Sequence, residues 1–458
     1  MRPLGKIGIG ALGRPDSDMQ ERLPLPLRRL AADRRGATAL IFAASAVVLL
    51  GFAGLATEGG TWYLEKRHGQ NAADAAVIAA ALAIANHQDP GVSAIAAATG
   101  TGANYTSHNV TITVGFFDAA GRTFTGNNTP ANAVRAVVTT TRPPLFSALF
   151  IGQQQVTISE SAVAMMAATG PACILAGSSA AGPGAGSMTF GATANVQAAD
   201  CSFASNGIRQ GAITGASSAT VAANQRLVSA GGCIGCAGTS PLTYQPQTPD
   251  PFAQTIGTFT GLPTKAGTQC NTKSGAPVPY GSTTPPTINC NGFSVAGTTL
   301  DLMPGTYVFY DSSISFNGGS ITCSTCTGSG NSGVTIIMTG TNPGSVGSID
   351  VEGNAIIDLV APAINEFNSV FDGVLFYTDQ KAALGNMVNI SGSQAATLGG
   401  VMYFPASNVT FAGNGGGAVP SCSEIIAASL NFTGYSVFSS RGCPQNTVPW
   451  TQSVRLVK

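Results

Sequence analysis

The sequence predicts a mainly β protein with an N-terminal transmembrane α-helix, a small membrane-proximal α+β unit, and a distal, disulfide-bonded domain of parallel β-helix-like (solenoid) type. Three observations predict this class: one uncharged apolar run near the N-terminus, ten cysteines confined to the later part of the chain, and short β-branched runs that recur at solenoid spacing. Only 9% of the 458 residues are charged and the formal net charge is zero. Such a chain has no long-range field to attract nucleic acid, so this partner is excluded.

Residues 37–57 contain no charged side chain, and a helix of about 20 such residues crosses the hydrocarbon core of a bilayer. In residues 1–36, eight arginines and lysines outnumber four acids, which by the positive-inside rule predicts a cytoplasmic tail. Arg34 and Arg35 are expected at the cytoplasmic interface, and Trp62 and Tyr63 at the opposite one. The rest of the chain would then be periplasmic or extracellular.

A cleaved signal peptide is the alternative, because Gly54-Leu55-Ala56 is a small-x-small sequence that would permit cleavage after Ala56. The apolar run is longer than the usual core of a signal peptide, and the tail before it is long. A retained anchor is therefore favoured over a cleaved signal.

Residues 58–169 are expected to form the membrane-proximal unit, an Ala-rich helix followed by a small β unit. Residues 72–85 include nine alanines, which predicts a helix that is either an exposed continuation of the anchor or a close-packing surface for like helices. The stretches VTITVGFFD, AVRAVVTT and QVTISESAVAMMA predict strands, and AAGRTFTGNNTPAN between the first two predicts a loop.

The N-terminal pattern resembles a known family. Arg34-Arg35-Gly36, a small-residue helix ending in Glu58 and two glycines, the Trp62-Tyr63 pair and then QNAADAAVIAAALA are similar to the start of TadG-like proteins of the Flp (tight adherence) pilus-assembly system. The resemblance is strongest over residues 28–86 and weaker to residue 168. It implies a single-pass inner-membrane protein whose partners are pilins or other pilus-assembly proteins. A prepilin carries Glu five residues after its processed glycine, whereas Ile41 stands there, so processing as a major pilin is not expected.

The cysteines predict disulfides, because their number is even and the first 172 residues, which include the cytoplasmic tail, have none. The candidates are Cys173, Cys201, Cys233, Cys236, Cys270, Cys290, Cys323, Cys326, Cys422 and Cys443. Zinc is the alternative at the two CxxC pairs, but the three histidines, at 68, 87 and 108, lie far upstream of them.

At Gly170-Pro171 the composition changes to a Gly/Ser-rich β region, residues 170–237, which an irregular Pro/Thr-rich connection, residues 238–300, joins to the β-helix-like domain, residues 301–458. The recurring runs are TYVFY, VTIIMTG, AIIDLVAP, GVLFYTD, GVMYFP and EIIAASL. Cys422 and Cys443 bracket the last of these, so a bridge between them is expected to close one end of the solenoid, and Cys173 with Cys201 the other.

Parallel β-helices often act on polysaccharides, but no arginine lies between Arg226 and Arg441, and the acids of residues 350–379 are scattered. Asp311 to Ser315, DSSIS, fits the metal-adhesion signature of von Willebrand A domains, yet the following FNGGSITCSTC cannot form the long helix of that fold, so a polar turn is predicted.

No catalytic, cofactor or metal site is predicted. The expected function is therefore non-enzymatic assistance in assembling or anchoring a Flp-type pilus. An exported adhesin for carbohydrate or host surfaces, and a carbohydrate-active enzyme, are the alternatives.

Overall fold

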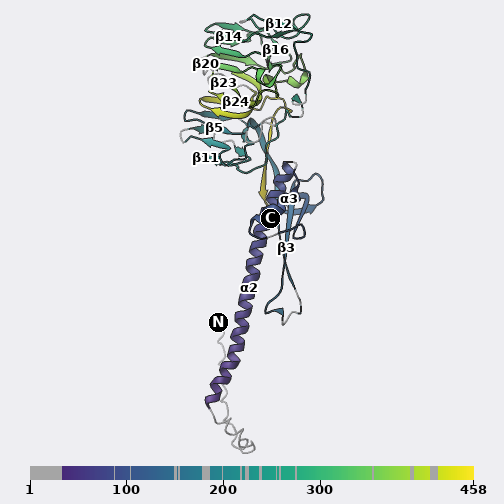
Figure 1. The fold of residues 1–458 in the computed structure, drawn as a ribbon, viewed down its shortest axis with the longest axis vertical. Coiled ribbons are helices and arrows are strands. Elements are labelled where there is room, and N and C mark those ends of the chain that lie inside the picture. Colours follow the sequence, from purple (N-terminus) through teal and green to yellow (C-terminus); the bar gives the residue numbers. More distant parts are fainter. Residues whose placement is uncertain are drawn as a thin grey trace, which may run out of the picture. The chain divides into compact units, whose positions relative to one another are not determined.

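A computed structural model describes residues 34–457, apart from residues 87, 104, 149–151, 153–154, 178–185, 199, 217–218, 222–225, 237–239, 254, 257–258, 274–275, 353–354, 392–396 and 413–420 and the side chains of 34–37. The chain divides into two compact units, residues 1–71 with 138–160 and residues 72–137 with 161–458. Most of the tail predicted to be cytoplasmic, residues 1–33, lies outside the described residues. The described part is mainly β, with one long apolar helix, a 24-stranded mixed sheet and a three-stranded sheet (Figure 1).

Helix α2 (Arg34–Ala85) is 52 residues long, about 78 Å at 1.5 Å per residue, which is much longer than a bilayer crossing requires. It is a candidate membrane anchor by its length and hydropathy. Its large apolar side chains are more than half exposed to the surroundings: Leu40, Ile41, Phe42, Val47, Val48, Leu49, Leu50, Phe52 and Leu55. A helix with apolar side chains on all its faces is the form expected of one surrounded by lipid.

The alanine-rich end of α2 is buried within the chain. Ala72, Ala73, Ala76, Val77 and Ala80 all have no exposed surface. The stretch is therefore not an exposed continuation of the anchor, and its buried face is not free to pack against another copy. Small side chains instead let this part of the helix pack closely within the second unit, to which residues 72–85 belong.

The small α+β part contains α3 (Pro90–Gly100), β1 (Val110–Asp118), β2 (Thr123–Gly126) and β3 (Ala133–Arg142). Asp89 caps α3, since its carboxylate accepts the backbone N–H groups of Gly91 and Val92 at 2.7 and 3.2 Å. β2 lies in the segment predicted as loop and pairs antiparallel with β1. The prediction missed it because the turn depends on the Asp118 side chain, which accepts the N–H groups of Ala120 and Gly121.

Strand β4 (Val156–Ala176) has two partners. Residues 164–171 pair antiparallel with β27 (Trp450–Leu456), and residues 174–176 enter a ladder of parallel strands. The remaining strands are β5 (Met188–Phe190), β6 (Asn195–Ala198), β7 (Ser202–Ser205), β8 (Ile213–Gly215), β9 (Thr220–Val221), β10 (Leu227–Ser229), β11 (Cys233–Ile234), β12 (Gln269–Asn271), β13 (Thr287–Asn289), β14 (Phe293–Ala296), β15 (Thr299–Asp301), β16 (Gly305–Tyr310), β17 (Ile314–Asn317), β18 (Ser320–Thr322), β19 (Val334–Thr339), β20 (Ile349–Glu352), β21 (Ile356–Val360), β22 (Val374–Thr378), β23 (Asn386–Ile390), β24 (Thr397–Phe411), β25 (Ser423–Phe432) and β26 (Tyr435–Phe438). The six recurring runs of the sequence are found in β16, β19, β21, β22, β24 and β25. Two 3₁₀ turns, η3 (Pro343–Ser345) and η4 (Ser369–Phe371), lie between them.

From β13 to β23 each strand pairs in parallel with the third strand after it or, at the end of the series, with the long strand β24. The three ladders are β13-β16-β19-β22-β24, β14-β17-β20-β23-β24 and β15-β18-β21-β24. Strands β12 to β14 and the start of β15 lie in residues 238–300, the connection predicted to be irregular. These strands are only three or four residues long and lie among proline and threonine residues, so no strand pattern was visible in the sequence.

The ladders continue through β25 into strands from much earlier in the chain. β25 pairs with β24 on one side and with β4 and β5 on the other, and these lead on to β7 and β8 and then to β10 and β11. Figure 1 shows β24 between β23 and β5. The strands of residues 174–234 and 269–432 therefore build one stack. Strand β25, which is the last of them in the sequence, lies in the middle of this stack.

The parallel ladders bury apolar side chains on both faces. In β25, Ile425 and Ala427 belong to one buried cluster and Ile426 to another on the opposite face. The second face is covered by the connection, where Phe252 packs 4.8 Å from the ring of Tyr403. Burial on both faces explains why the strands appear in the sequence as short continuous apolar runs.

All ten cysteines are paired, which confirms the predicted disulfides. The pairs are Cys173–Cys201, Cys233–Cys236, Cys270–Cys290, Cys323–Cys326 and Cys422–Cys443. The prediction that Cys422–Cys443 and Cys173–Cys201 close the ends of a solenoid is wrong, because β25 and β4, which these bridges flank, are neighbours inside the stack.

We expect the denatured, unreduced protein to take up no iodoacetamide and to take up ten equivalents after reduction, since no cysteine is free. Intact-mass spectrometry measures both states, and a non-reducing digest identifies the pairs. Alkylation of Cys233 or Cys236 before reduction would contradict the local bridge between them. It would favour the alternative that this CxxC pair binds zinc.

Candidate functional site: a buried carboxylate beside the apolar helix

Glu58 lies one residue after the uncharged run of α2, yet its side chain is only 2% exposed. Its Oε1 accepts the backbone N–H of Leu145 at 2.9 Å and the Ser147 hydroxyl at 2.7 Å. Its Oε2 accepts the N–H groups of Phe146 and Ser147 at 3.0 and 2.7 Å. Four donors thus surround one carboxylate, which offsets the cost of removing its charge from water.

The donors belong to a loop, residues 143–148, that follows β3. Pro143 and Pro144 lack an N–H and cannot extend the strand, so the chain turns there. The next three residues aim successive N–H groups at one point, which is a typical anion-binding arrangement of backbone. The N-terminal sequence pattern includes Glu58 but predicts no partner for it. A single acid at the end of an apolar run was the available signal.

Gly54, one helical turn before Glu58, gives the loop close access to α2. A Cβ atom at residue 54 would stand 2.8 Å from the Phe146 ring. The ring therefore packs on the helix backbone, which only glycine permits. The residue that suggested a signal-peptide cleavage site thus has a packing role within the continuous helix.

Two ion pairs join the same elements further along α2. Arg142 Nη2 lies 2.8 Å from Glu65 Oε1, and Lys66 Nζ lies 4.0 Å from Glu160 Oε1. Arg142 and Glu160 are the charged residues that bound the uncharged stretch 143–159, so both sides of this stretch are tied to neighbouring positions of the helix. Exposed pairs of this kind stabilise weakly, but they fix the position of the loop along α2.

The predicted interface residues lie at the two ends of the apolar run. Trp62 is half-buried and Tyr63 is 60% exposed, with the Arg67 guanidinium 5.7 Å from the centre of the Tyr63 ring. Arg34 and Arg35 begin α2, and their side chains lie outside the described part of the chain.

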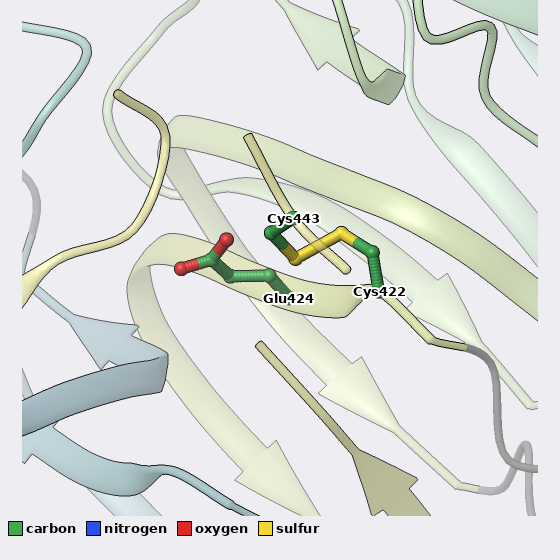
Figure 2. Close-up of side chains that lie close together, drawn as sticks. All are labelled: Cys422, Glu424 and Cys443. Carbon is green, nitrogen blue, oxygen red and sulfur yellow. A yellow bond between two sulfur atoms is a disulfide. The ribbon is translucent and has the colours of Figure 1, made fainter. Parts of the chain in front are cut away.

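A second cluster lies around the start of β25, where Cys422 and Glu424 meet Cys443 from the segment after β26. Figure 2 shows Glu424 beside the Cys422–Cys443 disulfide, with ligand-type atoms of the three residues within 4.8 Å of one another. Neither carboxyl oxygen of the fully buried Glu424 has a hydrogen-bond partner among the described residues. Burial raises the pKa of Glu424 well above its usual range, which favours the neutral form of the acid. The bonded sulfurs are not thiolates, so a neutral acid and a disulfide are poor metal ligands.

The DSSIS turn is held by its own aspartate. Asp311 accepts hydrogen bonds from Thr341 N–H, Thr341 hydroxyl and Ser345 hydroxyl at 2.6, 2.8 and 2.7 Å, and pairs with Lys265 at 3.0 Å. Desolvation alone would raise the pKa of Asp311, but these hydrogen bonds outweigh it and hold the pKa well below its usual range. The pentapeptide joins β16 to β17 as the predicted polar turn, with its carboxylate already engaged.

The acids considered for an active site are dispersed. Asp379 pairs with Lys381 and accepts the Thr339 hydroxyl, and Asp372 accepts the N–H of Asn365. Among the described residues, the cysteine cluster of β25 is the single grouping of three acids, cysteines or histidines close enough to share an ion.

Comparison with known proteins agrees with the N-terminal pattern. No curated protein and no solved structure matches the chain. Residues 36–83, which include Glu58 and the alanine-rich stretch, match the family model Tad, described as putative Flp pilus-assembly TadE/G-like. The chain therefore carries a TadE/G-like segment of the Flp pilus-assembly kind at residues 36–83, as the sequence resemblance predicted.

Proposed function

We propose that the protein is a non-enzymatic, membrane-anchored component that assists assembly or anchoring of a Flp/Tad-type pilus. The match of residues 36–83 to the TadE/G-like family carries this proposal. The anchor is a single pass through the inner membrane, with the N-terminus in the cytoplasm and the bulk of the chain outside it. The exposed apolar surface of α2 supports the anchoring role.

The parallel ladders support a β-helix-like rod as the form of the exported part. Their third-strand pairing is what a coil of three strands per turn produces, and continuation through β25 lengthens the stack. A rod with few charges would act through its surface and its partners, which are pilins or other assembly proteins. No feature of the described residues favours the adhesin or the carbohydrate-active enzyme over this role.

Deletion of the gene is expected to lower pilus number and surface attachment, and the wild-type gene to restore both. Electron-microscopic counting of pili and an attachment assay measure the effect. A gene with Val48→Arg and Leu49→Arg together should not restore them, because each arginine at the centre of a span costs about 2.5–3.5 kcal/mol of insertion free energy.

The matched control is Leu64→Arg, which places the same charge at an exposed apolar position of α2 beyond the uncharged run. It should stay in the membrane fraction and restore pili. Unchanged pilus number in the deletion strain would refute the pilus role, and full restoration by the double-arginine gene would refute the anchor.

A further inference from the structure

The loop at residues 143–148 presents apolar side chains beside the end of the uncharged helical run. Leu145 is 65% exposed and Phe146 47% exposed, although both donate backbone N–H groups to the buried Glu58. The Phe146 ring lies against Gly54, so these side chains stand level with the last turn of the run. Leu55, on that same turn of the helix, is 54% exposed.

Apart from the buried Glu58, the charged residues around the loop lie away from this level. Arg142 pairs with Glu65, seven residues beyond Glu58, which is about 10 Å further along the helix. From residue 143 to residue 159 the sequence has no charged side chain, and residues 149–151 continue it as Leu, Phe and Ile. The loop therefore begins beside the Arg142–Glu65 ion pair and extends toward the apolar run without any charged side chain of its own.

The hydrogen bonds to Glu58 remove the main obstacle to contact with lipid. Irregular backbone is excluded from hydrocarbon because its N–H groups have no partner there. Here the N–H groups of three consecutive residues all donate to the Glu58 carboxylate. With the Ser147 hydroxyl, they give this carboxylate four donors in total. The backbone donors and the acid satisfy each other, so Leu145 and Phe146 can leave water without exposing them.

We infer that the loop at residues 143–148 is a second membrane contact, in which Leu145 and Phe146 enter the leaflet beside the end of the span and Glu58 fixes the loop to α2. This inference rests on the proposed membrane anchoring. The lipid bilayer is the occupant that the arrangement favours, because the exposed apolar surface of the loop continues that of the helix. Two membrane contacts would restrict rotation and tilt of the anchor, which a single helix leaves free.

A single tryptophan in the loop tests the contact. The full-length protein, with its two native tryptophans removed as Trp62→Phe and Trp450→Phe, is reconstituted in vesicles of phosphatidylethanolamine and phosphatidylglycerol. Leu145→Trp is compared with Leu50→Trp in the span and with Tyr244→Trp, whose position is 60% exposed. We expect brominated lipid to quench the residue-145 tryptophan at least half as strongly as the residue-50 one, and acrylamide to quench it several-fold less than the residue-244 one.

The outcomes separate the possibilities. Quenching at residue 145 that matches residue 244 would overturn the inference. A blue-shifted emission that brominated lipid leaves unquenched would also overturn it, by placing protein rather than lipid on the loop. Absence of lipid quenching at residue 50 would instead refute the proposed anchoring. A far-UV circular-dichroism spectrum and a Tm like those of the wild type show that each variant has folded.

Glu58→Gln tests the role of the acid as a positioning residue. The substitution keeps the size of the side chain but replaces one acceptor oxygen by an NH₂ group, which repels the loop N–H groups. In the Leu145→Trp protein it should lower brominated-lipid quenching at least twofold. Glu65→Gln, the same change in the exposed ion pair, should leave quenching within experimental error. Equal quenching in the two variants would refute the role of Glu58 in fixing the loop to α2.

Discussion

Replacement of Phe432 by alanine is expected to produce the largest loss of stability of any single change in the β-rich part. The ring is fully buried in β25 and stacks on Phe190 of β5 at 5.5 Å, a contact between residues 242 positions apart in the sequence. It also packs on Phe438 at 5.9 Å. Removing a core phenylalanine costs about 3–5 kcal/mol, which lowers Tm by about 4–7 °C for a unit of this size.

Thermal unfolding of the detergent-solubilised protein, followed by circular dichroism, measures the shift. Met387→Ala is the matched control, since this apolar side chain lies in β23 of the same stack but is 60% exposed. Its Tm should change by no more than a degree or two. A Phe432→Ala protein with the wild-type Tm would mean that the two strand segments do not meet at β25.

The recurring strands could be predicted because each is a short β-branched run between turn residues, and that pattern is local. The runs TYVFY, VTIIMTG and GVLFYTD are found as β16, β19 and β22, paired in the order of the sequence. The insertion of residues 174–234 beside β25 could not be predicted in this way. It depends on the pairing of Leu430 with Met188 and of its neighbours, and no local pattern encodes which apolar run becomes adjacent to which.

The candidate site divides in the same manner. The local sequence predicted an apolar helix with aromatic residues after it, because the length of an uncharged run and its flanking residues are properties of one continuous segment. The environment of Glu58 depends on a loop 87 residues later, whose donors are backbone groups that every residue but proline carries. Glu424 was missed for a related reason: its burial follows from the coverage of β25 and not from the run EIIAASL, in which an acid at the first position resembles a solvated strand end.

Stability of the protein is expected to fall as the pH rises above about 4.5, and Glu424 is the cause. Burial raises the pKa of the folded-state acid well above the 4.5 that is usual for a glutamate in water, so between these two values the unfolded chain releases a proton that the folded chain retains. The folded state then binds more protons than the unfolded state, and the free energy of unfolding decreases with pH, by about 1.4 kcal/mol per pH unit for one group. Below pH 4.5 the acid is protonated in both states and the cost is absent.

Glu424→Met should abolish this dependence, because it fills a similar volume without an ionisable group. Its Tm should exceed that of the wild type by an amount that grows as the pH rises above about 4.5, with removal of a buried unsatisfied polar group adding about 1–3 kcal/mol at every pH. Glu352→Gln removes an exposed acid from β20 of the same stack and should track the wild type throughout. Parallel pH profiles for Glu424→Met and wild type would show that the acid has a partner in solution, so that its ionisation is not opposed by the fold.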